Sequence, residues 1–283
     1  MAVPLLCACI TLTTEPRAVV SGPAGTADVV ALRCDDAVRA MQDARARNAA
    51  GALDGQAFRT LVWNIHKEAD VGWDRDLAQF AAASDVVLLQ ETALTLPLRN
   101  ALEGAGLRWV LASSFMYDAD DIGVLTATRI APLASCTQRA VEPLLRIPKS
   151  AVITWLRIAG IEETVAIVNV HAINFEIFLQ AYRAQLEAIA DALASHRGPI
   201  ILAGDFNTWS DSREQVVAEI AARLGLKELV LPVDQRATFL GRHVDHIFVR
   251  GLELADVVAI PVTSSDHNPV MATLRIPSHV TDD

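Results

Sequence analysis

The amino-acid sequence predicts an α/β domain whose sheets are covered by helices. Between Arg59 and about Ile276, short apolar runs of strand length alternate with amphipathic stretches of helix length. The apolar runs show little polar alternation, which is typical of strands buried on both faces. Most of them also end on a carboxylate, a carboxamide or an imidazole. We therefore interpret residues 58–278 as one domain, with an extension at 1–57 and a tail at 279–283.

The elements follow from the pattern in chain order. The extension is rich in Ala, Gly, Arg and Asp. Its sequence predicts one helix within 35–50 and no strong strand. Ser210 or Asp211 is the expected N-cap of the last helix. In the longest helix, one apolar stripe recurs every three or four residues: Phe178, Tyr182, Leu186, Ile189 and Leu193. Strands are expected at 61–64, 85–91, 165–171, 199–205, 243–249 and after Pro269, and helices at 73–83, 177–196 and 212–226.

Composition and charge restrict the classes of partner. The 283 residues are 52% hydrophobic and 20% charged, and the net charge is −10. Long phosphate tracts are bound by clustered Lys and Arg, so a surface for a long nucleic-acid duplex is not expected. No apolar run approaches the ~20 residues of a membrane helix, so we expect no transmembrane segment. We expect a monomer.

The four cysteines fit no zinc-site spacing. Cys7 and Cys9 lie in a short apolar start that lacks the positive segment of a signal peptide. It is either a leader or the remains of a signal or lipoprotein segment that begins upstream. As written, the chain favours a cytoplasmic location, with export as the alternative. Cys34 and Cys136 are expected to form a disulfide only in an exported protein.

The polar residues at the strand ends are the candidate functional residues. Each one alone fits a turn or a structural hydrogen bond. Together, on loops at the rim of a sheet, they predict a shared site. No nucleophile elbow, zinc-protease motif or phosphate-binding loop accompanies them. The set consists of Asn64, Glu91, His171, Asp205, Asn207, Asp245, Asp266 and His267.

These residue types suit the hydrolysis of a phosphoester. Hard oxygen ligands favour Mg²⁺, which bridges carboxylates to substrate phosphates. A carboxylate beside a carboxamide can orient and activate water, and a histidine next to a carboxylate can stay protonated and neutralise a phosphoryl oxygen.

Seven segments resemble, in order, the motifs of the endonuclease/exonuclease/phosphatase superfamily, which has the deoxyribonuclease-I-like fold. They are WNIHK, LLQET, GVLTAT, VNVHAINF, AGDFNTWSD, VDHIFV and SSDHNPV, and they cover about residues 58–276. RIPKSA, HAINF and GRHVDHIFVRGL further resemble the bacterial YafD-like subfamily. The resemblance implies a four-layer α/β/β/α sandwich with the motifs meeting at one edge.

The resemblance also implies roles in metal binding and substrate binding. Glu91 would be the principal metal ligand, with Asn64 beside it, and Asp266 would bind the metal directly or through water. Some members carry an acidic residue where this chain has His66, so metal binding would depend more on Glu91. The substrate-binding candidates lie in the subfamily-like segments: Lys67, Lys149 and Asn174.

The remaining residues would carry the catalytic roles. Asp205 would orient or deprotonate the attacking water, and Asn207 would bind the scissile phosphate. His267, held by Asp245, would stabilise the charged transition state. His171 would contact phosphate or protonate the leaving group.

The sequence therefore predicts a phosphodiesterase or nuclease that depends on Mg²⁺, with Mn²⁺ as a substitute. The alternatives are a phosphomonoesterase, a sphingomyelinase-like lipid phosphodiesterase and a catalytically idle binding module.

Overall fold

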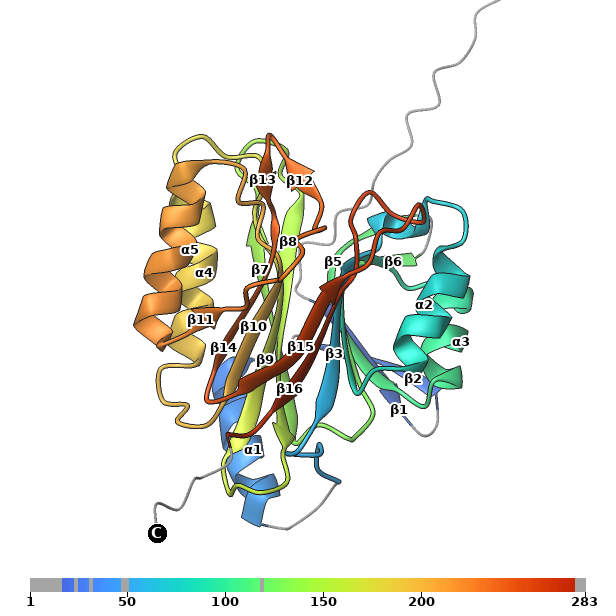
Figure 1. The fold of residues 1–283 in the computed structure, drawn as a ribbon, viewed down its shortest axis with the longest axis vertical. Helices are drawn as coiled ribbons and strands as arrows, with labels where there is room; N and C mark the ends of the chain where they lie inside the picture. The colour runs from blue at the N-terminus through green and yellow to red at the C-terminus, as the bar shows by residue number, and fades with distance from the viewer. Residues whose placement is uncertain (1–16, 23–24, 31–32, 47–50, 118–119, 278–283) are drawn as a thin grey trace, which may run out of the picture.

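Two β-sheets pack face to face, and helices cover their outer faces (Figure 1). The computed structural model describes residues 17–22, 25–30, 33–46, 51–117 and 120–277. This architecture confirms the predicted four-layer sandwich. The leader with Cys7 and Cys9 and the tail at 279–283 lie outside the described residues.

The first sheet has eight strands in the order β15-β16-β3-β4-β6-β5-β1-β2. Its outer face is covered by α2 (Trp73–Ala82) and α3 (Leu96–Gly104), which bury Leu77 and Leu98 against Trp63 and Leu89. The short 3₁₀ helix η1 (His66–Glu68) follows β3. The strands are β1 (Arg17–Gly22), β2 (Gly25–Val30), β3 (Phe58–Asn64), β4 (Val86–Ala93), β5 (Arg108–Tyr117), β6 (Asp120–Thr128), β15 (Glu253–Ala259) and β16 (Val270–Arg275).

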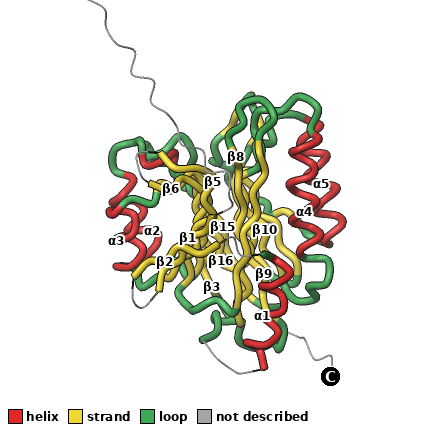
Figure 2. Tube along the Cα trace, turned by 180° about the vertical axis from the view of Figure 1, so that it is seen from behind, coloured by secondary structure: helices red, strands yellow, loops and turns green. Residues whose placement is uncertain are grey.

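The second sheet has six strands in the order β11-β14-β10-β9-β8-β7. Helices α4 (Gln180–Ala192) and α5 (Asp211–Leu224) cover its outer face, as both views show (Figure 2). The two sheets meet through aliphatic side chains such as Leu88 and Ile167. The strands are β7 (Ala134–Val141), β8 (Pro148–Arg157), β9 (Thr164–His171), β10 (Ile200–Asp205), β11 (Lys227–Glu228) and β14 (Asp245–Arg250), and a separate hairpin pairs β12 (Thr238–Phe239) with β13 (Arg242–His243).

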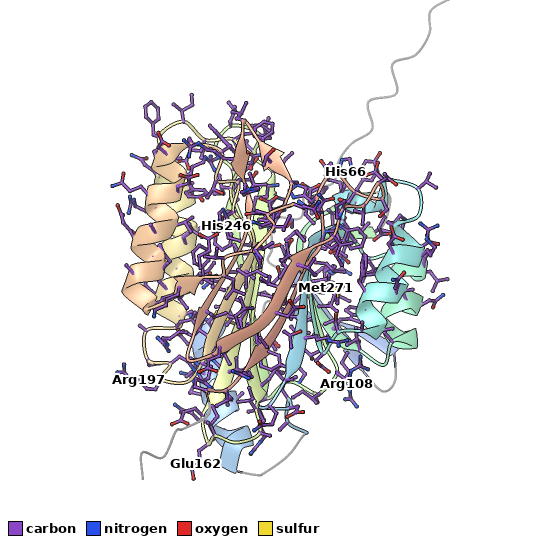
Figure 3. All side chains as sticks on the ribbon, in the orientation of Figure 1. His66, Arg108, Glu162, Arg197, His246 and Met271 are labelled. Carbon is purple, nitrogen blue, oxygen red and sulfur yellow. A yellow bond between two sulfur atoms is a disulfide. The ribbon has the colours of Figure 1, made fainter. Side chains whose placement is uncertain are left out.

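Strand direction brings the polar strand ends to one edge of the molecule. β3 runs parallel to β4, and β9 runs parallel to β10, with His171 opposite Asp205. β14 is antiparallel to β10 and starts with Asp245 opposite Asp205. In Figure 3, His66 and His246 lie in the upper part of the molecule, whereas Glu162 of the β8–β9 turn lies at its lower end. We call this upper end, where the polar strand ends meet, the active-site edge.

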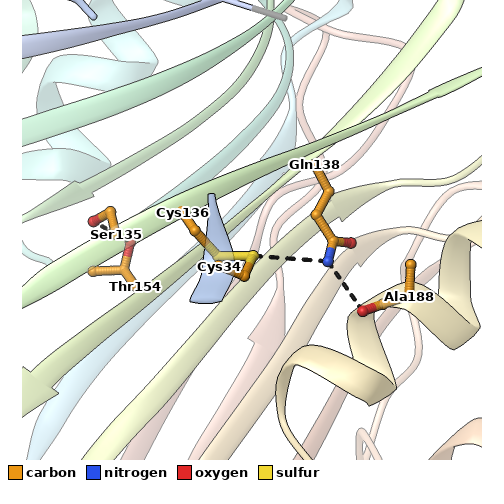
Figure 4. Close-up of a disulfide and its surroundings, with 6 residues drawn as sticks. All are labelled: Cys34, Ser135, Cys136, Gln138, Thr154 and Ala188. Carbon is orange, nitrogen blue, oxygen red and sulfur yellow. Dashed lines mark hydrogen bonds between the residues drawn. A yellow bond between two sulfur atoms is a disulfide. The ribbon is translucent and has the colours of Figure 1, made fainter. Parts of the chain in front are cut away.

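The extension is built into the sandwich and forms two strands, although its sequence indicates no strong strand. β1 pairs with both β2 and β5, and α1 (Cys34–Ala46) packs against β7. Cys34 and Cys136 form a disulfide with Cα atoms 4.9 Å apart. Gln138 donates to Ala188 of α4 and to the Cys34 sulfur (Figure 4). Six-residue strands carry little local signal, so pairing with β5 decides their conformation.

The helix predicted to be the longest, α4, is shorter than its periodicity indicates. It begins at Gln180, after Leu179 adopts a left-handed conformation with φ 56°. Phe178, placed in the apolar stripe by its spacing, precedes the helix and is 82% exposed, whereas Tyr182 and Leu186 are buried as predicted. Ser210 is the N-cap of α5. Among the described helices, none has both the length and the apolar character required to cross a membrane.

Candidate active site

Glu91 occupies a bulge in β4 at the active-site edge. The register of β4 against β6 shifts between Leu89 and Thr92, and Glu91 has φ 49°, a conformation uncommon outside glycine. Bulges redirect a side chain out of the ladder and occur next to active sites. Here the bulge leaves the Glu91 carboxylate 19% exposed and surrounded by cationic and imidazole groups.

Three basic side chains converge on this carboxylate. The ammonium of Lys67 contacts Oε2, while Lys149 Nζ lies 4.0 Å and His171 Nε2 3.8 Å from Oε1. Burial works to raise the pKa of Glu91, but His171, Lys149 and Lys67 outweigh it and lower the pKa to about 2. At neutral pH, where His171 is uncharged, the two ammonium groups remain as the counterions of Glu91. Glu91 is therefore a fixed anion at neutral pH.

Asp205 lies at the end of β10 and is almost completely buried. Its Oδ2 accepts a hydrogen bond from Asn64 Nδ2 at 3.0 Å, and its Oδ1 accepts one from the backbone N–H of Asn207 at 2.9 Å. Burial raises the pKa of Asp205 to about 6, opposed by His267 and reinforced by Asp245. The preceding Gly204 has φ 138°, and a Cβ there would lie 2.0 Å from the Val170 carbonyl oxygen. Glycine at position 204 is thus required by the close packing of β10 on β9.

His267 pairs with Asp245, as the sequence predicted. His267 Nδ1 lies 2.7 Å from Asp245 Oδ2, and the two side chains are 14% and 6% exposed. Burial disfavours the charged ring, but the charge and hydrogen bond of Asp245 raise the pKa of His267 to about 10. The ring is therefore an imidazolium at neutral pH.

Asp205, Asp245 and His267 place ligand-type atoms within 4.8 Å of one another. The Nδ1 atom of His267 is engaged by Asp245, so only Nε2 of a deprotonated ring could bind a metal, as in many histidine ligands. In the protonated state the trio combines one imidazolium with two carboxylates and can transfer a proton and stabilise charge.

His171 has the opposite protonation state. Its Nε2 lies 2.8 Å from Lys149 Nζ and 3.5 Å from Asp205 Oδ2. Burial, with the Lys149 charge added to it, lowers the pKa of His171 well below 6.5. A neutral ring next to an ammonium accepts a hydrogen bond through Nε2, so the proton at this contact belongs to Lys149.

Two predicted residues make their hydrogen bonds and close contacts outside this network, although the charge of Asp266 still contributes to the raised pKa of His267. Asp266 has a 60% exposed side chain, and its carboxylate is 3.9 Å from His66 Nδ1, which also contacts Asp70 at 2.8 Å. Asn174 Oδ1 accepts from Trp209 Nε1 at 2.8 Å, so its amide holds two loops together. The other predicted residues converge on one edge: Asn64, Lys67, Glu91, Lys149, His171, Asp205, Asn207, Asp245 and His267.

Sequence reasoning missed the residues that support the site from below. Gln90 of the first sheet donates to Asn169 of the second at 2.6 Å, and Asn169 donates to the Leu89 carbonyl. This fully buried bridge joins the two sheets directly beside Glu91 and His171. A polar residue inside each apolar strand was its only signal in the sequence.

A second support is Arg213, which is fully buried in α5. It stacks on Tyr182 and Trp209 and donates to the carbonyls of Ile173 and Asn174. It thereby fixes the loop that follows His171. In the sequence it resembles an ordinary charged helix residue.

The donor set fits a hard divalent cation. Glu91 is a partly exposed anionic carboxylate, and its nearest neighbours are cations that compensate its charge. Asn64 is less available because its Oδ1 accepts from the His66 amide at 3.1 Å and its Nδ2 is bound to Asp205. Glu91 is thus an accessible anionic oxygen donor of the type that hard divalent cations bind, and a cation bound there would take the place of the Lys67 ammonium on Oε2.

A model of the Endonuclease/Exonuclease/phosphatase family matches residues 61–267, which include both ends of the site. The chain belongs to this family. Members of the family act on phosphoester bonds. The chain is 36% identical over 225 residues to a UPF0294 protein of Vibrio cholerae, covering 79% of each chain. It is 38% identical over 218 residues to one of Yersinia enterocolitica, covering 77% of this chain and 84% of that one. These relatives confirm the YafD-like resemblance.

Solved structures of this family share the fold. A protein from Beutenbergia cavernae superposes with a TM-score of 0.62 at 18% identity, covering 78% of this chain and 72% of that one. The human Nocturnin catalytic domain with bound sulfate anion gives a TM-score of 0.61 at 16% identity, covering 82% of this chain and 99% of that one. At these identities the likeness concerns the fold alone.

Proposed function

We propose that the protein is a Mg²⁺-dependent phosphodiesterase. The proposal rests mainly on one observation: the carboxylates of Glu91 and Asp205 both lie close to His171 Nε2, at 3.8 and 3.5 Å, and cationic side chains that are candidates for binding phosphate surround them. Bound at Glu91, a divalent cation would withdraw charge from a phosphoryl oxygen and lower the pKa of a nearby water.

The side chains around the phosphate take the other roles in hydrolysis. Asp205 accepts a proton from the attacking water, because burial makes it a stronger base than an ordinary aspartate. Asn64 and the Asn207 amide hold its two oxygens in place. Water adds to phosphorus, one ester P–O bond breaks, and the departing oxygen takes up a proton, leaving an alcohol and a phosphomonoester.

Charge on the phosphoryl group is met by three cationic groups. His267 presents an imidazolium held by Asp245, which is preorganised for oxygens that become more negative in the transition state. Lys67 and Lys149 supply ammonium groups beside Glu91. Lys149 also donates to His171, so a proton for the leaving group comes from this pair rather than from His171 acting alone.

A substrate panel with and without Mg²⁺ tests the proposal. It compares bis-p-nitrophenyl phosphate, p-nitrophenyl phosphate, plasmid and single-stranded DNA, RNA, sphingomyelin and inositol phosphates. We expect turnover of a diester that is lost in excess chelator. Glu91→Gln keeps the shape and removes the charge, so turnover should fall by about 10²-fold or more with an unchanged circular dichroism spectrum. Full activity in chelator would contradict the metal dependence.

We also infer that the chain reaches an oxidising compartment. Disulfides persist mainly in exported proteins, and Cys136, which pairs with Cys34, is fully buried. The pairing favours the export alternative over the cytoplasmic one. Alkylating free thiols in cells quenched and denatured in acid, and then mapping the modified cysteines by peptide mass, tests the inference. Cys34 and Cys136 are expected to be bonded and unmodified, whatever the state of Cys7 and Cys9, and alkylated Cys34 and Cys136 would contradict it.

A further inference from the structure

Seven of the fifteen large apolar side chains that the described chain exposes lie on three segments at the active-site edge: the β7–β8 loop, the loop after β9 and the β12–β13 hairpin. We call these seven residues the apolar rim. They are Leu144 (70% exposed), Leu145 (47%), Phe175 (49%), Ile177 (83%), Phe178 (82%), Phe239 (54%) and Leu240 (72%). The β12–β13 hairpin stands at the upper end of the molecule in Figure 1.

Hydrogen bonds join the three segments into one surface. Glu142 Oε1 of the β7–β8 loop accepts a hydrogen bond from the backbone N–H of Asn174 at 2.6 Å. Trp209 links the same Asn174 to the loop after β10, and Thr208 Oγ1 of that loop donates to the His243 carbonyl of the hairpin at 2.8 Å. The rim is therefore held on a rigid base rather than on independent flaps.

The hairpin tip carries an apolar residue that its turn does not favour. Leu240 and Gly241 form the two-residue turn between Phe239 and Arg242, with φ values of 52° and 79°. A turn with positive φ at both positions prefers Asn-Gly, and leucine is disfavoured there. Strained backbone at an exposed position is typical of functional segments. The leucine side chain is thus not explained by the turn itself.

Each rim segment continues directly into the site. Lys149 follows the β7–β8 loop, His171 precedes the second loop, and Asp245 follows the hairpin. A molecule resting on the rim would therefore present its phosphate to these residues. A molecule that carries apolar groups next to a phosphoester, and could therefore contact both the rim and the site, is an amphiphile such as a phospholipid.

The composition of the rim and the charge of the protein favour a lipid surface over a nucleic acid as the occupant of the rim. Four of the seven residues are aliphatic, and aliphatic side chains lack the ring faces on which nucleic-acid bases stack. The net charge of −10 also disfavours a polyanion. Isolated apolar tips on separate loops suit insertion into a fluid surface, which needs no matching shape.

We propose that the apolar rim docks onto the surface of a phospholipid bilayer and presents a lipid phosphodiester to the site. This rests on the proposed function for its chemistry, but docking itself does not require catalysis. Binding is expected on zwitterionic vesicles and at high salt, because apolar insertion rather than charge attraction drives it. Each fully inserted side chain contributes about tenfold or more to partitioning.

Co-sedimentation of the full-length protein with phosphatidylcholine vesicles tests the docking. Two rim variants are compared with wild type: the double variant Ile177→Ser/Phe178→Ser, and Leu240→Asn, which suits the turn better than leucine and should fold at least as well. The matched control is Leu254→Ser, which removes an exposed leucine at the opposite end of the first sheet, opposite Leu274 of β16. Both rim variants should bind vesicles at least tenfold more weakly, and the control should bind like wild type.

The outcomes separate docking from chemistry. Wild type that does not bind vesicles, or rim variants that bind as well as wild type, would overturn the proposal. A change of oligomeric state in the rim variants by size-exclusion chromatography would instead make the rim a protein–protein surface and overturn it as well. In activity assays, the ratio of vesicle turnover to bis-p-nitrophenyl phosphate turnover should fall in the rim variants. Vesicle binding without turnover of either substrate would refute the proposed function and leave the docking intact.

Discussion

The protonation of His267 can be changed without touching its ring. Asp245→Asn preserves the size of the partner that lies 2.7 Å from His267 Nδ1 and removes its charge. Burial then acts on the imidazolium without its principal counterion, so the pKa of His267 should fall to 6.5 or below. The variant should therefore lose activity as the pH rises through neutrality, where wild type retains it.

The magnitude follows from the pKa. A rise from 6.5 to about 10 corresponds to about 5 kcal/mol of preference for the imidazolium, at about 1.4 kcal/mol per pH unit. Wild-type His267 is thus almost fully charged at pH 8, whereas a ring with a pKa of 6.5 is about 3% charged. The kcat of Asp245→Asn should fall by about 30-fold at pH 8 and recover toward pH 6. Because the folded-state pKa is raised, the pair stabilises the fold fully below pH 6.5 and loses this contribution as the pH passes about 10.

The assay is the pH dependence of kcat on bis-p-nitrophenyl phosphate between about pH 6 and about pH 9, with the ring titration followed by NMR. His267→Gln is the control. The pH–rate profile of this variant should show no limb due to an imidazole. Adding Asp245→Asn to it should lower kcat little further. A His267 resonance that still titrates near pH 10 in Asp245→Asn, or an unchanged rate profile, would refute the reasoning.

Three further predictions concern the leaving group and the N-terminal elements. His171→Ala should be mild on a diester with a p-nitrophenolate leaving group and severe on an alkyl diester, and equal losses would reject a part for His171 in protonation. Replacing Cys34 and Cys136 by serine should lower the free energy of unfolding in urea by about 4–5 kcal/mol, since the bond closes a separation of 102 residues. Reductant should destabilise wild type equally and leave this variant unchanged. Deleting residues 1–50 should lower the melting temperature markedly, because it removes β1 and α1, and an unchanged melting temperature would show that these elements are accessory.

Local patterns were sufficient to predict which side chains meet at one edge. Apolar runs that end on Glu91, His171 and Asp205 identify buried strands, and strands of this kind place their ends on a common rim. This inference uses information that lies within about ten residues along the chain, which is the range over which periodicity is informative. The four-layer fold, in contrast, was implied by the family resemblance of seven motifs spread over the whole domain.

The tertiary structure decided what each group does. His171 and His267 are both histidines at strand ends, yet one is neutral and the other is an imidazolium. Their partners, Lys149 and Asp245, each lie 22 positions away in the sequence. The exposure of Phe178 likewise depends on where the loop after β9 is anchored. Burial and neighbouring charge are properties of the packed chain, so the sequence by itself determined where the chemistry lies, and only the folded structure determined the charge that each group carries.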